Sequence, residues 1–438
     1  MYFTLDSELV NLLDTYLREC PYVVWSIHMD DRVLREGDVS VAVTPELCGT
    51  LEEMEVEVVL DRDCTQIEHT GNERRLGKTP DTSVDIVPHA STTWLEHVSI
   101  AFFPGFMGLL SPTLVLRRIQ RDYALPSIVA SLYLALGTAV FTGFLVMFIA
   151  RVIKYPSSVV EEFKHPVKRN FFPAIGICLA IICLGVADLW KGVYTSTGVH
   201  NTWYYTGLAL CYIASGSHIG VSFTIFIEWL SERPVPKDSI NPTNLIPPVA
   251  NLFMAICMGT CDRTELGWLF WGAGVILYIG VFSMCLMSMV SGHSLAPALT
   301  PSIFILAAPG GLAFISYSAL TGGEWDVVSR LFAYSCLYFW CLAMVFLVIR
   351  AIPWMRTEFQ LSWWAITFPS AATAVTSFDV AYYIKREYGT NTISRWVSFT
   401  IAAADFTVVG VCLVATIFQG LRCTLFCPDA VRSPKSAV

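Results

Sequence analysis

One short stretch combines a bulky ring, a run of small side chains and a charge. Residues 363–374 read WWAITFPSAATA, and Asp379 follows shortly after. On an α-helix, Phe368 and Asp379 are about three turns apart, so their side chains point in nearly the same direction, about 16 Å apart along the axis. The same face carries Trp364, Ala371, Ala372 and Val375. A pore wall would have this pattern, with the ring as a plug and the acid in the pore mouth.

Phe368 therefore has two interpretations. A hydrophobic constriction can gate a pore by excluding water. Ordinary helix packing is the alternative, because small residues let helices approach closely and a phenylalanine ring fills the remaining gap. We predict that Phe368 is a pore gate and Asp379 a pore-mouth residue, with helix packing as the open alternative.

A second stretch gathers positive charge at the start of an apolar run. Residues 161–177 read EEFKHPVKRNFFPAIGI and contain Lys164, His165, Lys168 and Arg169. A basic mouth above a low-dielectric passage concentrates anions. The same bases could instead anchor the chain to anionic lipid headgroups. We predict an anion vestibule at these four residues and keep the lipid anchor as the alternative.

The composition indicates what kind of element must position these residues. Of 438 residues, 54% are hydrophobic and only 15% are charged, and the mean hydropathy is +0.56. Soluble domains carry far more charge, so a polytopic membrane protein is expected. The sequence shows no CxxC pair, no zinc-type spacing of cysteine and histidine, and no phosphate-binding loop that precedes a helix. We therefore predict no enzyme activity, cofactor, metal or nucleic-acid partner.

Ten apolar segments are long enough to be membrane-spanning helices, which need roughly 20 residues each. They cover residues 97–116, 127–150, 171–190, 203–230, 246–262, 267–290, 301–320, 328–350, 363–384 and 396–418. The segment 246–262 is the shortest of them. The expected fold is all-α.

Prolines divide the ten segments into two groups. The odd-numbered segments contain Pro104, Pro173, Pro247, Pro248, Pro309 and Pro369, whereas the interiors of the even-numbered segments contain none. Proline removes a backbone donor and bends a helix. We predict that bent odd helices form an inner ring and that straighter even helices surround them. The alternative is that these prolines only mark the starts of helices.

The ends of the chain differ from its middle. Residues 1–94 contain 19 acidic and 7 basic side chains, and the segments 5–19 and 54–62 resemble an amphipathic helix and a strand. We expect a cytosolic extension at 1–94, either a small α+β domain or partly disordered, then a transmembrane domain at 95–420 and a cytosolic tail at 421–438. The distribution of Lys and Arg among the linkers slightly favours cytoplasmic termini.

Four stretches resemble one family of membrane proteins. They are FKHPVKRNFFPAI at 163–175, INPTNLIPPVANL at 240–252, PSIFILAAPGGLAFISY at 301–317 and SWWAITFP at 362–369. They lie in this order within residues 97–418, a stretch of about 320 residues that is similar to the tellurite-resistance/dicarboxylate transporter family. That family includes bacterial TehA, fungal malate permeases, sulfite exporters and the slow-type anion channels of plants.

The resemblance implies a fold and an activity. It implies ten helices in five hairpins, proline-kinked odd helices around a central pore, and a homotrimer with one pore per subunit. The pore-blocking phenylalanine of the family falls on Phe368. Relatives often have a basic residue near the end of the ninth helix, where this chain has Asp379, so weaker attraction for anions is expected there.

The expected function is a passive channel or transporter for anions. Chloride, nitrate, sulfite and a dicarboxylate such as malate are the candidate ions, and the plasma membrane is the expected location. The alternatives are a proton-coupled dicarboxylate carrier that uses Asp379 or Asp405, and a membrane receptor with residues 1–94 as its signalling domain.

Overall fold

The computed structural model of this chain divides into two compact units. Residues 1–87 form one and residues 88–438 form the other. The structure describes residues 3–4, 24–28, 40–46, 94–197, 202–231, 240–291, 295, 297–355 and 359–421. The predicted helix at 5–19, the predicted strand at 54–62 and nearly all of the C-terminal tail lie outside these residues.

The described part of the first unit is a small antiparallel sheet. Its strands are β1 (Phe3–Thr4), β2 (Val24–His28) and β3 (Ser40–Glu46). They are ordered β1-β3-β2, with Val24 opposite Glu46 and His28 opposite Ala42. The sequence patterns that we used did not predict β2 or β3, although both contain the β-branched residues that favour strands.

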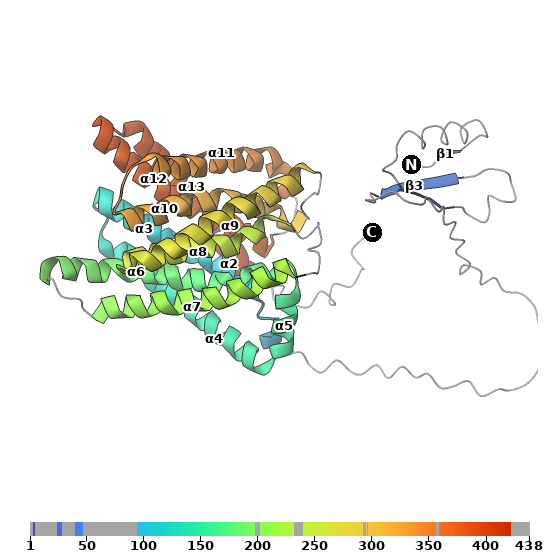
Figure 1. The fold of residues 1–438 in the computed structure, drawn as a ribbon, viewed down its shortest axis with the longest axis horizontal. Helices are drawn as coiled ribbons and strands as arrows, with labels where there is room; N and C mark the ends of the chain where they lie inside the picture. The colour runs from blue at the N-terminus through green and yellow to red at the C-terminus, as the bar shows by residue number, and fades with distance from the viewer. Residues whose placement is uncertain are drawn as a thin grey trace, which may run out of the picture. The chain divides into compact units, whose positions relative to one another are not determined.

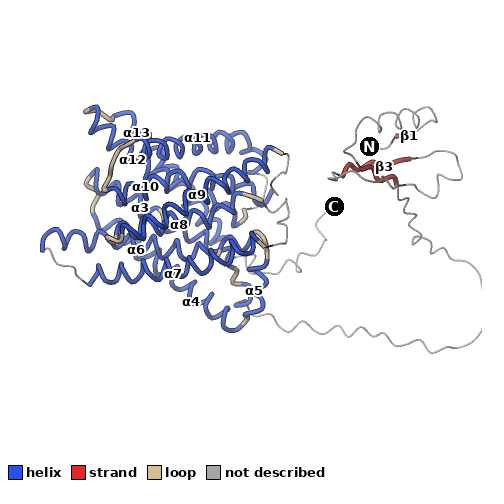
Figure 2. The backbone as a smooth tube through the Cα atoms, viewed as in Figure 1, coloured by secondary structure: helices blue, strands red, loops and turns tan. Residues whose placement is uncertain are grey.

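The second unit is all-helical in its described residues (Figures 1 and 2). Its α-helices are α2 (Phe103–Leu110), α3 (Pro112–Tyr123), α4 (Ser127–Lys154), α5 (Pro156–Lys164), α6 (Pro173–Thr197), α7 (Thr202–Leu230), α8 (Ile246–Thr260), α9 (Thr264–Val290), α10 (Ala308–Thr321), α11 (Val327–Met355), α12 (Thr367–Tyr388) and α13 (Thr392–Leu421). The 3-10 segments are η2 (Trp94–His97), η3 (Ile100–Phe102), η4 (Lys168–Phe171), η6 (Pro242–Leu245), η7 (Pro297–Ala307) and η8 (Leu361–Ile366).

Eight described helical segments are long and apolar enough to cross a membrane. They match eight of the ten predicted spans; those at 246–262 and 363–384, which contain α8 and α12, are not among them. The polytopic membrane character is therefore supported, whereas the ten-helix count and the five hairpins stay predictions. The first span runs to Tyr123, beyond the predicted end at 116, because α3 continues directly after α2.

Burial alternates along the chain. In the segments Lys168–Ala187 and Leu299–Thr321, 67% and 83% of the span is buried, compared with 22% in both Thr264–Val290 and Val327–Ile349. The side chains of α8 and of the first two thirds of α12 are almost entirely buried. The helices of the even-numbered spans, such as α4, α9 and α11, expose large apolar side chains, for example Leu136, Ile276 and Val348. A surface of this kind suits contact with lipid tails.

The position of each odd-span proline has a structural explanation. Each lies within the first three residues of an α-helix, and a 3-10 segment ends at or just before that helix. These residues are Pro104 in α2, Pro173 in α6, Pro247 and Pro248 in α8, Pro309 in α10 and Pro369 in α12. Proline is tolerated there because the first N–H groups of a helix have no intrahelical partner. The prolines thus mark the change from 3-10 to α-helix, and the predicted kinks stay predictions.

Helix α12, which carries Phe368, is held tightly against α2. A Cβ atom on Gly108 would collide with Oγ1 of Thr367. The hydroxyl of Thr367 donates to the carbonyl of Trp364 at 2.7 Å, and the indole of Trp364 donates to Thr416 of α13 at 2.9 Å. The start of α12 is therefore fixed by a glycine contact on one side and by a hydrogen-bonded indole on the other.

Candidate functional site

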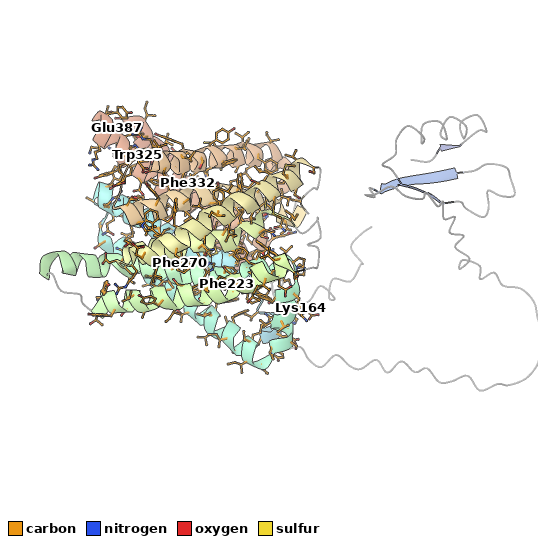
Figure 3. All side chains as sticks on the ribbon, viewed as in Figure 1. Lys164, Phe223, Phe270, Trp325, Phe332 and Glu387 are labelled. Atoms are coloured by element: carbon orange, nitrogen blue, oxygen red, sulfur yellow. The ribbon has the colours of Figure 1, made fainter. Side chains whose placement is uncertain are left out.

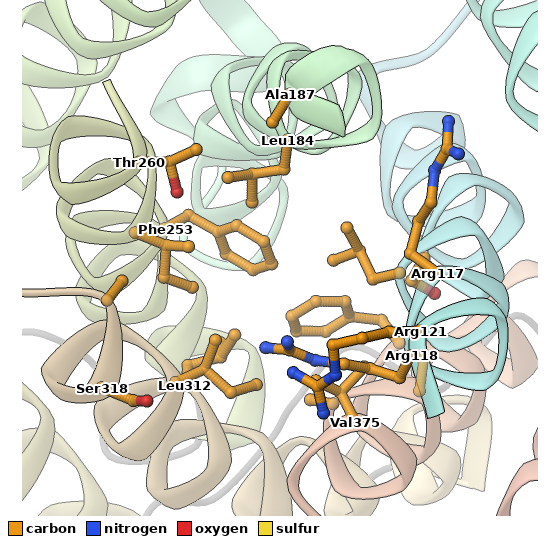
Figure 4. Close-up of a pocket in the computed structure, with 18 of the residues that line it drawn as sticks. Arg117, Arg118, Arg121, Leu184, Ala187, Phe253, Thr260, Leu312, Ser318 and Val375 are labelled. Atoms are coloured by element: carbon orange, nitrogen blue, oxygen red, sulfur yellow. The ribbon is translucent and has the colours of Figure 1, made fainter. Parts of the chain in front are cut away.

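A cavity of about 530 Å³ lies between five helices (Figure 4). It is the larger of two cavities that share a lining residue of α12. Its lining includes Arg117, Arg118 and Arg121 of α3, Leu184 and Ala187 of α6, Phe253, Ile256 and Thr260 of α8, Leu312, Ile315 and Ser318 of α10, and Phe368, Ala371, Ala372 and Val375 of α12. Most of these residues belong to the C-terminal halves of the odd-span helices. The wall is apolar apart from the arginines and a few hydroxyls.

A second cavity of about 270 Å³ lies near the N-terminal ends of the same group of helices. Its lining includes Pro104 and Met107 of α2, Phe171 of η4, Ile246 and Val249 of α8, Leu299 and Ile305 of η7, and Trp364, Phe368 and Pro369 around the start of α12. This wall is predominantly apolar. Two of the predicted pore prolines, Pro104 and Pro369, therefore contact this cavity, whereas Pro173, Pro248 and Pro309 are not among its lining residues.

Phe368 is the one described residue that lines both cavities. Its side chain is nearly buried, and its ring lies 5.5 Å from the ring of Phe253, with a tilt of 42° between the two planes. Phe253 lines only the larger cavity. A pair of rings from α12 and α8 therefore stands where the two cavities approach each other.

The small residues that follow Phe368 contact the larger cavity, as their spacing predicted. Ala371, Ala372 and Val375 lie on one face of α12 and line this space. Trp364, which was expected on the same face, instead lines the second cavity. The switch follows from local structure, because Trp364 belongs to the 3-10 segment η8, where residues advance 120° rather than 100° per position.

Asp379, the predicted pore-mouth residue, is paired with two arginines in the structure. Its carboxylate is 94% buried and forms ion pairs with Arg118 and Arg121, each at 3.1 Å. Asp379 itself is not among the residues that line the larger cavity, whereas both arginines are. The positive charge of the two guanidinium groups thus lies between the acid and the cavity.

The arginines of α3 are the functional candidates that sequence reasoning missed. We counted Arg117, Arg118 and Arg121 among the bases of a linker, because the apolar run ends at 116. The signal was present in PTLVLRRIQRDY, in which Leu114, Val115 and Ile119 continue a helical pattern past the first basic residue. Long arginine side chains at a span end are expected to reach polar surroundings.

The predicted anion vestibule lies elsewhere. Lys164 ends α5, His165 follows it, and Lys168 and Arg169 form the start of η4. In Figure 3, Lys164 and Glu387 lie at opposite ends of the helical unit. None of the four vestibule residues is among the described side chains that line the two cavities. Their role in anion binding stays a prediction.

Local contacts reduce the charge that this predicted vestibule offers. Lys168 pairs with Glu162 at 3.8 Å, and Arg169 is buried. Partial desolvation and the charge of Lys168 lower the pKa of His165, and its ring nitrogen accepts the backbone N–H groups of Val167 and Lys168. His165 is therefore neutral at neutral pH, and the exposed charge here comes from Lys164 and part of Lys168.

The carboxylate of Glu162, near this predicted vestibule, connects several segments of the helical unit. It pairs with Arg151 of α4 at 2.6 Å and accepts the hydroxyl of Ser99 at 2.6 Å and the backbone N–H of Ile100 at 3.3 Å. Arg151 also donates to the carbonyl of Val98 at 3.1 Å. These contacts fasten α4 and α5 to the start of the first span.

Comparisons with known proteins agree with this architecture. The S-type anion channel SLAH3 of Arabidopsis thaliana is 25% identical over 276 residues, which cover 62% of this chain and 40% of that protein. The tellurite resistance protein TehA homolog of Haemophilus influenzae is 22% identical over 276 residues, which cover 62% and 78% of the two chains. An uncharacterized transporter of Methanocaldococcus jannaschii is 23% identical over 246 residues, which cover 52% of this chain and 69% of its own length.

A family model extends the match beyond these pairs. The chain spans less than half of the plant channel's length, so whole-protein properties do not carry over from that relative directly. The family model described as "Voltage-dependent anion channel" matches residues 97–417, nearly the whole helical unit and both cavities. The predicted resemblance to tellurite-resistance proteins and plant slow-type anion channels is confirmed, and the chain belongs to the voltage-dependent anion channel family.

Proposed function

We propose that this protein is a passive anion channel or transporter in which the ring of Phe368 closes the pathway. The observation that carries the proposal is the position of Phe368 as the described residue shared by the two cavities. The family membership and the names of the anion-channel relatives support the same activity. Chloride, nitrate, sulfite or a dicarboxylate is the transported ion.

The proposed pathway runs through both cavities along the odd-span helices. An anion in the larger cavity meets the arginines of α3, then the alanines of α12, and then the rings of Phe368 and Phe253. Two apolar rings in contact leave no room for a hydrated ion, and stripping water from an ion in an apolar passage is costly. Opening therefore requires the Phe368 ring to leave the path.

Substitution of the ring tests the proposal. Phe368→Ala should raise anion flux well above that of the wild type in reconstituted liposomes, because it joins the two cavities. Phe378→Ala is the matched control: this ring is on the same helix and is fully buried, but lines neither cavity. Its loss should cost stability, by about 3–5 kcal/mol, without opening the pathway. A Phe368→Ala protein that is folded yet as silent as the wild type would reject the gate.

A proton-coupled carrier is the second candidate function, and Asp405 favours it. This residue of α13 is fully buried, and neither carboxylate oxygen has a hydrogen-bond partner among the described residues. An unpaired buried acid within a span is costly, and such acids commonly take part in proton relays. Asp379, the other acid considered for this role, is already paired with two arginines.

The assembly and location follow from the family resemblance and the charge pattern. We propose a homotrimer with one pore in each subunit, inserted in the plasma membrane with both termini in the cytoplasm. In this orientation the arginines of α3 lie at the extracytoplasmic end of the pathway. The helical unit at 95–420 conducts the anion, and residues 1–94 regulate it or direct its trafficking.

A further inference from the structure

Two arginines of α3 that line the larger cavity pair with the buried carboxylate of Asp379, which does not line it. Nη2 of Arg118 lies 3.1 Å from Oδ2 of Asp379, and Nη2 of Arg121 lies 3.1 Å from Oδ1. The carboxylate is almost fully buried, whereas the two arginine side chains are 29% and 43% exposed. The guanidinium groups are therefore accessible from the cavity while they hold the acid of α12.

The geometry of this contact fits one class of anion. Arg121 donates a hydrogen bond to Oδ1 of Asp379, and Arg118 forms an ion pair with Oδ2 that lacks hydrogen-bond geometry, so each oxygen faces its own guanidinium group. A free carboxylate or a nitrate ion presents the same pair of oxygens, and guanidinium groups recognise such planar oxyanions well. A chloride ion offers a single centre and cannot give each arginine a separate oxygen.

The neighbouring charges leave the arginines partly available. Arg121 also pairs with Asp122 at 2.6 Å and lies over the ring of Tyr382. Arg117 donates to the carbonyl of Gly185 on α6 at 3.0 Å, and in Figure 4 its head group turns away from those of Arg118 and Arg121. Three arginines and two acids give this cluster a net charge of +1, which rises to +2 when Asp379 is neutral. The cluster therefore attracts anions even with Asp379 in place.

We propose that Arg118 and Arg121 form a binding site for planar anions that present two oxygens side by side, such as carboxylates or nitrate. The side chain of Asp379 occupies this site as an intramolecular competitor. An incoming anion takes the place of the Asp379 carboxylate at the arginines. This inference rests on the proposed function, since it deepens the account of the same pathway. It reverses the expected role of Asp379: the acid limits anion binding by occupying the site, not by repelling ions from an open mouth.

Direct binding to the purified full-length protein tests the site without any flux measurement. Acetate, nitrate and chloride are each titrated at constant ionic strength against the thermal unfolding midpoint in detergent. In Asp379→Asn, the half-saturating concentrations of acetate and nitrate should fall about fivefold, the effect expected from removing a partly exposed ion-pair competitor. The value for chloride should stay within twofold. Equal values for the wild type and Asp379→Asn with acetate and nitrate would overturn the proposal, as would an equal fall for chloride.

A control and a second variant make the result specific. Glu387→Gln also removes a carboxylate of α12 that is paired with an arginine, Arg330 at 3.0 Å, but neither partner lines the larger cavity. It should leave all three titrations unchanged. Arg118→Gln should raise the half-saturating concentrations of acetate and nitrate, so the site remains testable if Asp379→Asn does not fold. Tighter acetate than nitrate binding identifies carboxylates as the ligand, and the reverse identifies nitrate.

The same variants separate this inference from the proposed function. If liposomes with the wild type and with Phe368→Ala carry no anion flux while the binding results hold, the transport proposal fails and the site stands. If Phe368→Ala opens the pathway but Asp379→Asn and Arg118→Gln bind acetate and nitrate as the wild type does, the transport proposal stands and the site fails.

Discussion

At the scale of single residues, position relative to the two cavities distinguishes side chains of the same type. Phe368 and Phe378 are both buried rings of α12, yet only Phe368 lines the cavities. The order of ring and small residues in the sequence singled out Phe368, which lines both cavities, and its role as a gate stays a prediction. The partners of Asp379 could not be predicted, because Arg118 and Arg121 are more than 250 positions away in the chain and meet it only through the packing of α3 on α12.

The unpaired carboxyl of Asp405 allows a test between a channel and a proton-coupled carrier. A neutral asparagine has nearly the shape of a protonated aspartate, so Asp405→Asn should fold and conduct as the wild type does if transport is passive. Anion uptake into liposomes, with and without an imposed pH gradient, is the measurement. For a channel, the gradient should add no uptake in either protein. Uptake that the gradient drives in the wild type but not in Asp405→Asn would favour the carrier.

At the scale of helices, the sequence predicted the major spans but not their ends. The apolar runs correctly located the eight described membrane-length segments. The 3-10 segments η3, η4, η6, η7 and η8 were not predicted. Segments η3, η7 and η8 have the same apolar character as the helices that follow, whereas η4 and η6 are more polar and lie largely before the predicted spans. The prolines indicated where the α-helical part begins, because proline is favoured in the first turn.

The contact between α2 and α12 yields a prediction for a glycine. Gly108→Ala should destabilise the protein by about 1–3 kcal/mol, because the added Cβ collides with Thr367 and forces α2 and α12 apart. Gly105→Ala is the matched control on the same helix, since its Cβ would lie 3.4 Å from the ring of Trp364, an ordinary contact distance. Thermal unfolding of both variants in detergent measures the effect. Equal midpoints would show that α2 and α12 are not closely packed at Gly108.

At the scale of the whole molecule, burial separates the helices into two classes, as the prolines had suggested. The odd-span segments supply the buried core and line both cavities, whereas the even-span helices expose apolar side chains suited to lipid. Prolines in the odd spans alone indicated this division; in the structure they lie at the starts of those helices, and the predicted bends stay predictions. Strands β2 and β3 of the first unit were not predicted, since such short strands gave no strong periodic signal, and the small α+β domain expected as one alternative at 1–94 stays a prediction.

The division into two units leads to a prediction about the first 87 residues. All residues that line the two cavities belong to the second unit. Removal of residues 1–87 should therefore leave the order of anion preference unchanged, whatever it does to the amount of flux. Reversal potentials of the full-length and shortened proteins, both with Phe368→Ala, give this order. A changed order would mean that the first unit takes part in ion selection.

The most direct test of the central claim is a graded series at position 368. If the Phe368 ring closes the pathway, anion flux in liposomes should rise as the side chain shrinks from Phe to Leu to Val to Ala. The same series at Phe378 should give no increase, because that ring lines neither cavity. Flux that is independent of side-chain size at 368, or that rises equally in both series, would contradict the account.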